Sequence, residues 1–250
     1  MYDVIVVGAR CAGASTAMLL GRKGYRVLLV DRARFPSDSP NGNCVLYPGV
    51  AQLKRWGLLD RVLASNCPPI RRWTSDLGDF ALSGEVTTSD CLPSAIGPRR
   101  VVLDKILVDA AVEAGVELRE GFGMSDMVTD GGRIAGIRGS ARGGATVTER
   151  ARIVIGADGR HSRVARLVGA ATYQERAPLA CYYYAFWAGV PVKGLEMYWQ
   201  PRRIVFVFPT NDGLTGIFVG LPHEQFHAFR SDIEGNYMRA IEMMPALDER

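Results

Sequence analysis

A turn with glycine at both ends follows the first apolar run of the chain. Val4 to Val7 reads Val-Ile-Val-Val, and Gly8-Ala9-Arg10-Cys11-Ala12-Gly13 comes next, before a segment rich in Ala, Leu and Met. Such a turn lets the backbone come close to a diphosphate, and the helix after it supplies free N–H groups and a positive dipole end. The sequence therefore predicts nucleotide binding at this turn.

An acid at the end of the second apolar run supports that prediction. Asp31 closes the run Tyr25 to Val30 and lies 18 residues after Gly13, where a carboxylate accepts hydrogen bonds from ribose hydroxyls. Arg10 departs from the G-x-G-x-x-G pattern because it replaces the middle glycine. Its side chain has to point away from the phosphates or bond to them. The alternative is a turn that needs glycine for its geometry alone.

A second glycine turn, Gly156-Ala157-Asp158-Gly159, follows the apolar run Ile153 to Ile155. An aspartate at the carboxyl end of a buried strand can reach a ribose or a pyrophosphate in the crevice there. The alternative, stronger for this motif alone, is an Asp-Gly turn that leads into a helix N-cap.

Four segments together resemble one family. Val4 to Asp31, the loop up to Leu58, Arg100-x-x-Leu103-Asp104 and the second glycine turn are similar to the FAD-dependent monooxygenases of the p-hydroxybenzoate hydroxylase type. The GARCAG turn resembles a subgroup of FAD-dependent oxidoreductases near the geranylgeranyl reductases. The resemblance covers nearly the whole chain, and the separation of the two glycine turns makes it specific.

The resemblance implies a role for individual residues. Those of the first turn hold the FAD pyrophosphate, Asp31 binds the AMP ribose with Arg32 beside the adenosine, and Arg100 reaches the flavin side. Met124 touches adenine through its backbone, Asn43 and Cys44 pass near the isoalloxazine, and Asp158 and Gly159 contact FAD and the pyridine nucleotide. The implied cofactor-binding set is Gly8, Arg10, Cys11, Ala12, Gly13, Asp31, Arg32, Asn43, Cys44, Arg100, Met124, Asp158 and Gly159.

The reaction implied by the resemblance comes from the cofactor. NAD(P)H reduces FAD, and a flavin hydroperoxide hydroxylates a small aromatic or apolar substrate. No catalytic side chain is assigned. A flavin-dependent C=C reductase of the geranylgeranyl-reductase type is the first alternative, and a nucleotide-binding fragment without turnover is the alternative from another class.

The predicted fold is α/β. Residues 1–75 and 98–170 form an FAD-binding domain with a parallel βαβ sheet and a three-stranded meander at about 123–129, 133–139 and 145–151. Residues 76–97 and 171–250 form a mostly antiparallel substrate domain, with Asn211-Asp212-Gly213 as a hairpin turn.

Composition excludes several other classes. The 250 residues carry a net charge of +4, spread evenly, which argues against a nucleic-acid partner. The apolar stretch from Leu179 to Val192 is too short to span a membrane. Five widely spaced cysteines without a CxxC pair predict reduced thiols and a cytoplasmic protein. The sequence does not predict an oligomeric state.

A histidine pair and an aromatic run each allow more than one interpretation. His223-Glu224-Gln225-Phe226-His227 matches the H-E-x-x-H pattern of zinc proteases, but no third ligand is evident, so no metal site is predicted. The aromatic run Tyr182 to Trp187, with Tyr198 and Trp199, predicts sheet core, and pocket lining is the alternative. A W-x-W-x-I-P segment, as in flavin halogenases, is absent from the sequence.

The end of the chain carries one more expectation. The family resembled has a second G-D motif further on, whose aspartate reaches the ribityl and phosphate region of FAD. No G-D-A-G segment is present, and the chain stops at Asp248-Glu249-Arg250 within a predicted helix. We therefore expect the chain to be partial.

Overall fold

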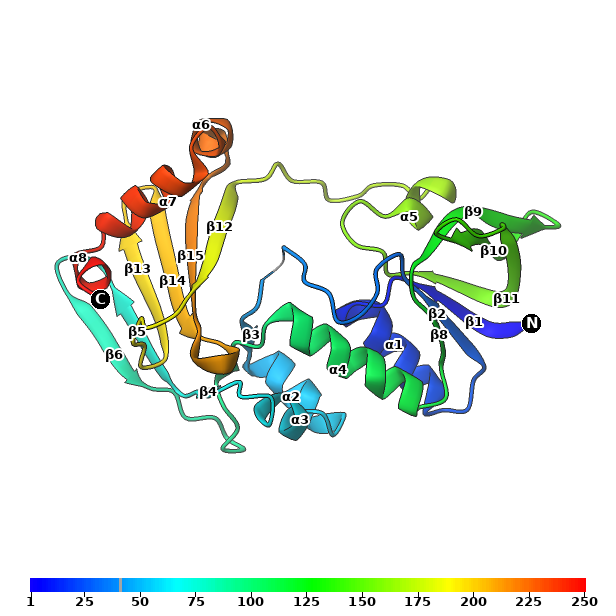
Figure 1. Cartoon of the computed structure of the whole chain (residues 1–250), viewed down its shortest axis with the longest axis horizontal. Helices are drawn as coiled ribbons and strands as arrows, with labels where there is room; N and C mark the ends of the chain where they lie inside the picture. The colour runs from blue at the N-terminus through cyan, green and yellow to red at the C-terminus, as the bar shows by residue number, and fades with distance from the viewer. Residues whose placement is uncertain (41) are drawn as a thin grey trace. The chain divides into compact units, whose positions relative to one another are not determined.

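The computed structural model describes residues 1–40 and 42–250, and Asn41, in the loop up to Leu58, lies outside the described residues. The chain divides into two compact units (Figure 1). Unit 1 contains Met1–Asn41 and Arg100–Gln174, and unit 2 contains Gly42–Arg99 and Glu175–Arg250. The main difference from the predicted domains is at residues 42–75, which pack with the second unit.

Unit 1 is built on a six-stranded sheet in the order β8-β2-β1-β11-β10-β9. The first four strands are parallel, and the last three form an antiparallel meander. Its elements are β1 (Tyr2–Val7), α1 (Cys11–Gly21), β2 (Val27–Val30), α4 (Arg100–Glu113), β8 (Glu117–Arg119), β9 (Phe122–Asp130), β10 (Arg133–Ala141), β11 (Val147–Gly156) and α5 (Arg163–Leu167). This is the predicted βαβ opening with its meander.

One boundary in unit 1 was wrong. The predicted third meander strand and the predicted strand Ile153 to Ile155 are a single strand, β11. Its first half pairs antiparallel with β10, and its second half pairs parallel with β1, from Ala151 to Gly156. One strand can take both partners because its two edges are independent. This register places Gly156 directly beside Val7, so the two glycine turns leave the sheet side by side.

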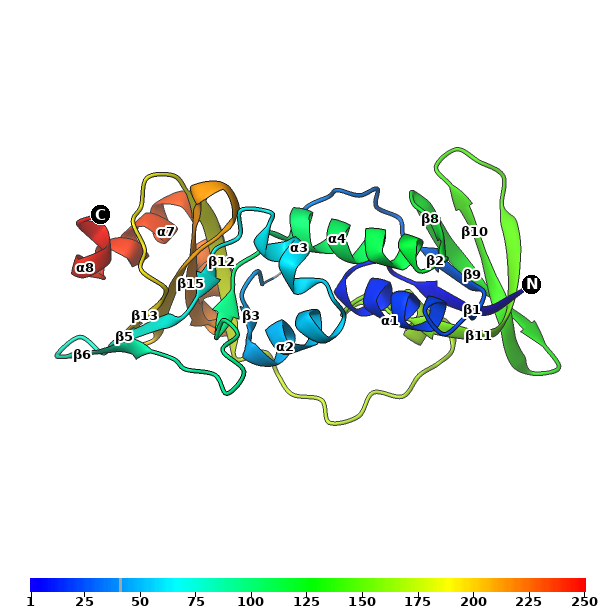
Figure 2. The same ribbon diagram turned by 90° about the horizontal axis from the view of Figure 1, so that it is seen from below.

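Apolar strands explain the core of unit 1. Ile5, Val7, Leu28 and Val30 lie on one face of the parallel strands, in a cluster with Val164 of α5 and residues of the meander. Helices α1 and α4 pack against each other in the same unit (Figure 2). Continuous apolar strands of this kind are typical of parallel sheets buried on both faces.

Unit 2 contains a second six-stranded sheet, in the order β12-β15-β14-β13-β5-β6, and a small sheet, β3-β7-β4. Its strands are β3 (Val45–Leu46), β4 (Pro69–Ile70), β5 (Arg72–Asp76), β6 (Ala81–Glu85), β7 (Ala95–Ile96), β12 (Ala180–Trp187), β13 (Leu195–Gln200), β14 (Arg203–Pro209) and β15 (Thr215–Pro222). Its helices are α2 (Tyr47–Arg55), α3 (Leu59–Leu63), η1 (Asn211–Gly213), η2 (His223–Gln225), α6 (Phe226–Arg230), α7 (Ile233–Glu242) and α8 (Pro245–Asp248).

Only the β5–β13 pair in the large sheet of unit 2 is parallel, which matches the predicted, mostly antiparallel domain. Helices α6 to α8 lie along one face of this sheet (Figure 1). Phe229, Tyr237 and Ile241 from these helices are buried against Val205 and Val219. Together the two units confirm the predicted α/β class. None of the described helices is long and apolar enough to cross a membrane.

Candidate functional site

The turn Gly8–Gly13 leaves the N-terminus of α1 open. The first intrahelical bond joins Ala14 N to Arg10 O at 2.9 Å, so the N–H groups of residues 11–13 come before it. Arg10, at the N-cap position, supplies no side-chain hydrogen bond to cap them. Free N–H groups at the start of an 11-residue helix, together with the helix dipole, form an anion-binding site.

Close backbone packing explains both glycines of this turn. Gly8 has φ of 102°, in the left-handed region, and a Cβ on it would overlap the carbonyl oxygen of Ala157. A Cβ on Gly13 would overlap the carbonyl oxygen of Gly8. Ala157 N also donates to Val7 O at 2.8 Å. The two turns are thus packed backbone to backbone, so neither glycine position admits a side chain.

Asp31 lies just after β2 and connects that strand to the turn. Its Oδ2 accepts from Ala9 N at 2.7 Å, and its Oδ1 accepts from Ala33 N at 2.8 Å. Each carboxylate oxygen can accept a second hydrogen bond, so ribose hydroxyls remain acceptable donors. Arg32, the next residue, is exposed.

The side chain of Arg10 leaves the turn, which answers the question raised by its position. Its Nη1 donates to Asp104 Oδ2 at 2.6 Å. Arg100, on the same helix as Asp104, donates to Asp104 through Nε at 3.1 Å and Nη2 at 2.8 Å. The Asp104 carboxylate is fully buried, so it needs these cationic partners.

Asp104 was not among the predicted site residues. Its signal in the sequence was its place four residues after Arg100 in R-x-x-L-D, which puts both side chains on one face of α4. The Cys11 thiol donates to Asp104 Oδ1 at 3.4 Å. Burial, the largest cause, raises the pKa of Cys11 to about 11, so the thiol is protonated at neutral pH.

Asp158 in the second turn caps α5. Its oxygens accept from Ser162 Oγ at 2.5 Å, Arg163 N at 2.6 Å and Val164 N at 3.2 Å. Burial alone would raise the pKa of Asp158, but these hydrogen bonds outweigh burial and lower it. The carboxylate therefore makes the hydrogen bonds expected from the alternative interpretation, in which Asp158 caps the helix. Gly159 has φ of 88° and open space around it.

Three further predicted residues lie on other segments, Met124 in unit 1 and Asn43 and Cys44 in unit 2. Met124 pairs with Gly139 across β9 and β10, and its side chain is buried in the core of unit 1. Asn43 is buried in unit 2, and Cys44 packs against an apolar cluster there. The roles assigned to these residues by the resemblance stay predictions.

The aromatic run in β12 serves two faces of its sheet, since side chains alternate along a strand. Tyr183 and Trp187 face the helices, where Tyr183 stacks on Phe229 and Trp187 Nε1 donates to Tyr237. Tyr184 stacks on Phe218 at 4.4 Å on the opposite face. Tyr182 and Phe206, 6.2 Å apart, extend that face, and Tyr182 is 51% exposed. Core packing is therefore confirmed on both faces, and pocket lining stays a prediction.

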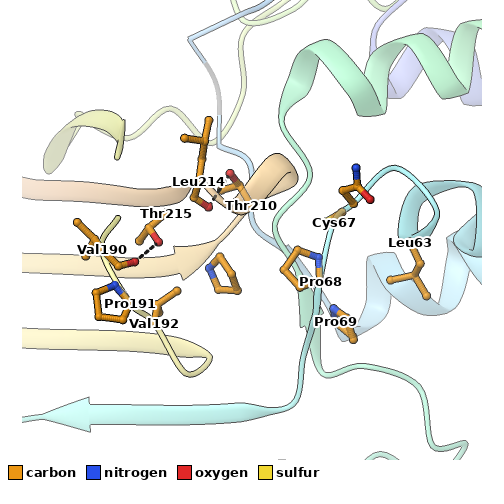
Figure 3. Close-up of a pocket in the computed structure, with 13 residues that line it drawn as sticks. Leu63, Cys67, Pro68, Pro69, Val190, Pro191, Val192, Thr210, Leu214 and Thr215 are labelled. Atoms are coloured by element: carbon orange, nitrogen blue, oxygen red, sulfur yellow. Dashed lines mark hydrogen bonds between the residues drawn. The ribbon is translucent and has the colours of Figure 1, made fainter. Parts of the chain in front are cut away.

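A cavity of about 630 Å³ lies within unit 2 (Figure 3). It is lined by Leu63, Asn66, Cys67, Pro68, Pro69, Val190, Pro191, Val192, Pro209, Thr210, Gly213, Leu214 and Thr215. Most of its lining residues are apolar, and Asn66, Thr210 and Thr215 are polar. Thr215 Oγ1 donates to Val190 O. Among the described residues that line it, Cys67 alone is titratable, and burial raises the pKa of its thiol to about 11.

The H-E-x-x-H segment spans η2 and the start of α6. Glu224 pairs with Arg202, and His223 stacks on Phe226. In the part of the chain that the structure describes, no group of three His, Cys, Asp or Glu side chains could hold a metal ion.

The fold and the first turn are those of dinucleotide-binding flavoproteins, and a comparison with protein families identifies the family. The model of the FAD binding domain family matches residues 1–250, so the chain belongs to that family. This confirms the predicted resemblance to FAD-dependent oxidoreductases and supports FAD as the cofactor.

Two relatives carry different activities in their names. A digeranylgeranylglycerophospholipid reductase from Methanocella arvoryzae is 26% identical over 227 residues, which are 88% of this chain and 56% of the relative. A 6-methylpretetramide 4-monooxygenase from Streptomyces rimosus is 30% identical over 174 residues, or 67% of this chain and 40% of the relative. The chain thus spans about half the length of these relatives.

Solved structures share the fold. The myxobacterial chondrochloren halogenase CndH, a FAD-dependent halogenase, superimposes with a TM-score of 0.84 at 24% identity, over 99% of this chain and 59% of that one. The halogenase PltM, solved with phloroglucinol and FAD, gives 0.72 at 18% identity, over 90% of this chain and 52% of that one. At these identities the likeness concerns the fold.

Proposed function

We propose that the chain binds FAD, with the diphosphate on the free N–H groups of residues 11–13. The observation that supports FAD binding most directly is the uncapped start of α1, in a turn whose two glycines admit no side chain. Asp31 takes the AMP ribose, and Arg100 lies toward the flavin. The proposed contact residues are those implied by the resemblance, with Arg10 contributing through its backbone: Gly8, Arg10, Cys11, Ala12, Gly13, Asp31, Arg32, Asn43, Cys44, Arg100, Met124, Asp158 and Gly159.

We propose further that the whole protein is an NAD(P)H-dependent monooxygenase of a small aromatic or apolar substrate. Bound FAD would supply electron transfer from NAD(P)H and oxygen activation. The monooxygenase relative supports the reaction class. The sheet face that carries Tyr182, Tyr184 and Phe206 supports the substrate class, because flat apolar rings stack on aromatic side chains.

The second candidate is a flavin-dependent C=C reductase. The reductase relative from Methanocella favours it, since the match covers 88% of this chain. Both candidates need the same cofactor site in unit 1, and they differ in whether oxygen reaches the product.

A cytoplasmic location is also proposed. The five cysteines carry free thiols, as is usual in a reducing compartment.

The first test is whether the protein binds FAD. Purified protein is titrated with FAD and followed by flavin absorbance and fluorescence, alongside Gly13→Val and Gly84→Ala. Gly84 lies on the edge strand β6 with open space around it, so its variant is the matched control. We expect the wild type and G84A to bind FAD and G13V to fail. A wild type that takes up no FAD overturns the cofactor proposal.

The second test separates the two reactions. NADPH and NADH oxidation are measured in air and without oxygen, with product analysis by mass spectrometry. A hydroxylated product that appears only in air supports the monooxygenase. A product two hydrogens heavier, formed without oxygen, supports the reductase and overturns the monooxygenase.

A further inference from the structure

Arg10 connects three segments of unit 1. Besides its bond to Asp104, its Nη1 donates to Ser37 O at 3.3 Å, and its Nη2 donates to Ser37 Oγ at 3.1 Å and Asp38 O at 3.2 Å. Its guanidinium lies 5.4 Å from the ring centre of Phe35, within cation–π range. A single side chain thus joins the glycine turn, helix α4 and residues 35–38.

The segment held by Arg10 begins beside the proposed ribose site. Ala33 N donates to Asp31, Gly121 N donates to Ala33 O, and Phe35 N donates to Glu120 Oε1 at 2.9 Å. These bonds attach residues 33–35 to the end of the sheet. Arg10 continues the attachment to residues 37 and 38, on the side of the turn itself.

Asp104 determines where the Arg10 side chain goes. The carboxylate is fully buried and accepts hydrogen bonds from two guanidinium groups and one thiol. A buried carboxylate left with fewer partners is unfavourable. The bond to Asp104 therefore stabilises the described rotamer of Arg10. The pairing keeps the guanidinium in the cluster and away from the open N–H groups of residues 11–13.

We propose that Arg10 and Asp104 are positioning residues of the FAD site. Arg10 acts on FAD binding by holding α4 and residues 35–38 against the glycine turn, not by taking a phosphate. The residue that replaces the middle glycine is therefore part of the scaffold. This proposal rests on the proposed FAD binding by the same turn.

The test is a double-mutant cycle with Arg10→Ala, Asp104→Asn and the pair. FAD dissociation constants are measured by fluorescence titration, with R142A, at an exposed arginine in the turn after β10, as the matched control. We expect each single variant to bind FAD about tenfold more weakly, roughly 1.4 kcal/mol, and the double variant to be no worse than the weaker single one. Multiplied losses in the double variant overturn the proposal, because they show that Arg10 contacts the cofactor independently of Asp104.

Hydrogen exchange of the FAD-free protein gives a second readout. Arg10→Ala should speed exchange at residues 37–39 and leave the meander strand β10 unchanged. Arg10→Lys, which keeps the charge but lacks the guanidinium fork, should exchange like R10A. Full protection in R10A, or full rescue by lysine, overturns the proposed contacts. A wild type that binds no FAD overturns the cofactor role instead, and the exchange data still decide whether Arg10 holds the segment.

Discussion

The two glycine turns of unit 1 begin alike and end differently. Each follows one of two neighbouring parallel strands, with Val7 and Gly156 in register. The first leads into α1, whose opening N–H groups are left uncapped by the side chain of Arg10. The second leads into the five-residue α5, which is capped by Asp158 and Ser162.

The difference shows what makes a turn available to a ligand. The acid beside the first turn is Asp31, which follows strand β2 and accepts a hydrogen bond from Ala9 N of the turn. In the second turn the acid lies within the turn and binds the helix itself. A carboxylate inside a turn accepts from the N–H groups at the start of the helix that follows, whereas one outside it leaves those groups open.

The largest expected effect comes from adding one methyl group to the first turn. In Gly13→Ala the new Cβ meets the Gly8 carbonyl, so α1 must move away from the turn. We expect a loss of about 3 kcal/mol in unfolding free energy, the upper end for overpacking, and FAD affinity reduced more than about 100-fold. Urea unfolding and FAD titration measure the two effects.

The matched variant in the second turn is Gly159→Ala. A Cβ there meets no atom, so the cost is that of a positive φ alone, about 1–2 kcal/mol. Gly13 has no positive φ, so a loss in G13A no larger than that in G159A would contradict the close packing at Gly13.

The next effect separates capping from ligand binding. Asp158→Ala removes two backbone hydrogen bonds at the start of α5 and Ser162→Ala removes one, and each variant should cost about 1 kcal/mol in unfolding free energy. FAD affinity should fall in D158A and stay unchanged in S162A. If neither variant changes FAD affinity, Asp158 serves only as a cap.

A smaller effect appears on acidification. The hydrogen bonds to Asp158 lower its pKa in the folded state below its usual value. Its stabilising contribution is therefore complete above the unfolded-state pKa of about 3.9 and is lost as the pH falls through the lower folded-state pKa. The stability difference between the wild type and Asp158→Asn should shrink below about pH 4 in urea unfolding. A difference that stays constant from pH 7 to pH 3 would contradict this.

The smallest expected effect concerns the thiol of the first turn. Burial raises the pKa of Cys11 to about 11, against the decrease that a helix N-terminus alone would give. Iodoacetamide at pH 7.5 should therefore modify the exposed Cys91 well before Cys11, as mass spectrometry of timed samples can show. Rapid labelling of Cys11 would mean that the helix terminus dominates its environment.

Local pattern was enough to predict much of unit 1. The strand, turn, helix and acid of residues 4–31 follow from apolar runs and glycines close together in sequence. The join of two predicted strands into β11 escaped prediction, because the break depended on partners on opposite edges of the sheet. The sorting of the aromatic run in β12 into two faces depended on where α6 to α8 pack.

The sequence by itself determined the first turn and the strand and helix beside it, since these depend on residue types at short spacings. It also determined the family and the α/β class, through a resemblance that covers nearly the whole chain. Only the tertiary structure decided how charged groups were used. Arg10 and Asp104 are 94 residues apart, and Asp158 could face a ligand or its own helix. A charge takes the partner that best compensates its loss of water, and packing between distant segments determines which partner is in reach.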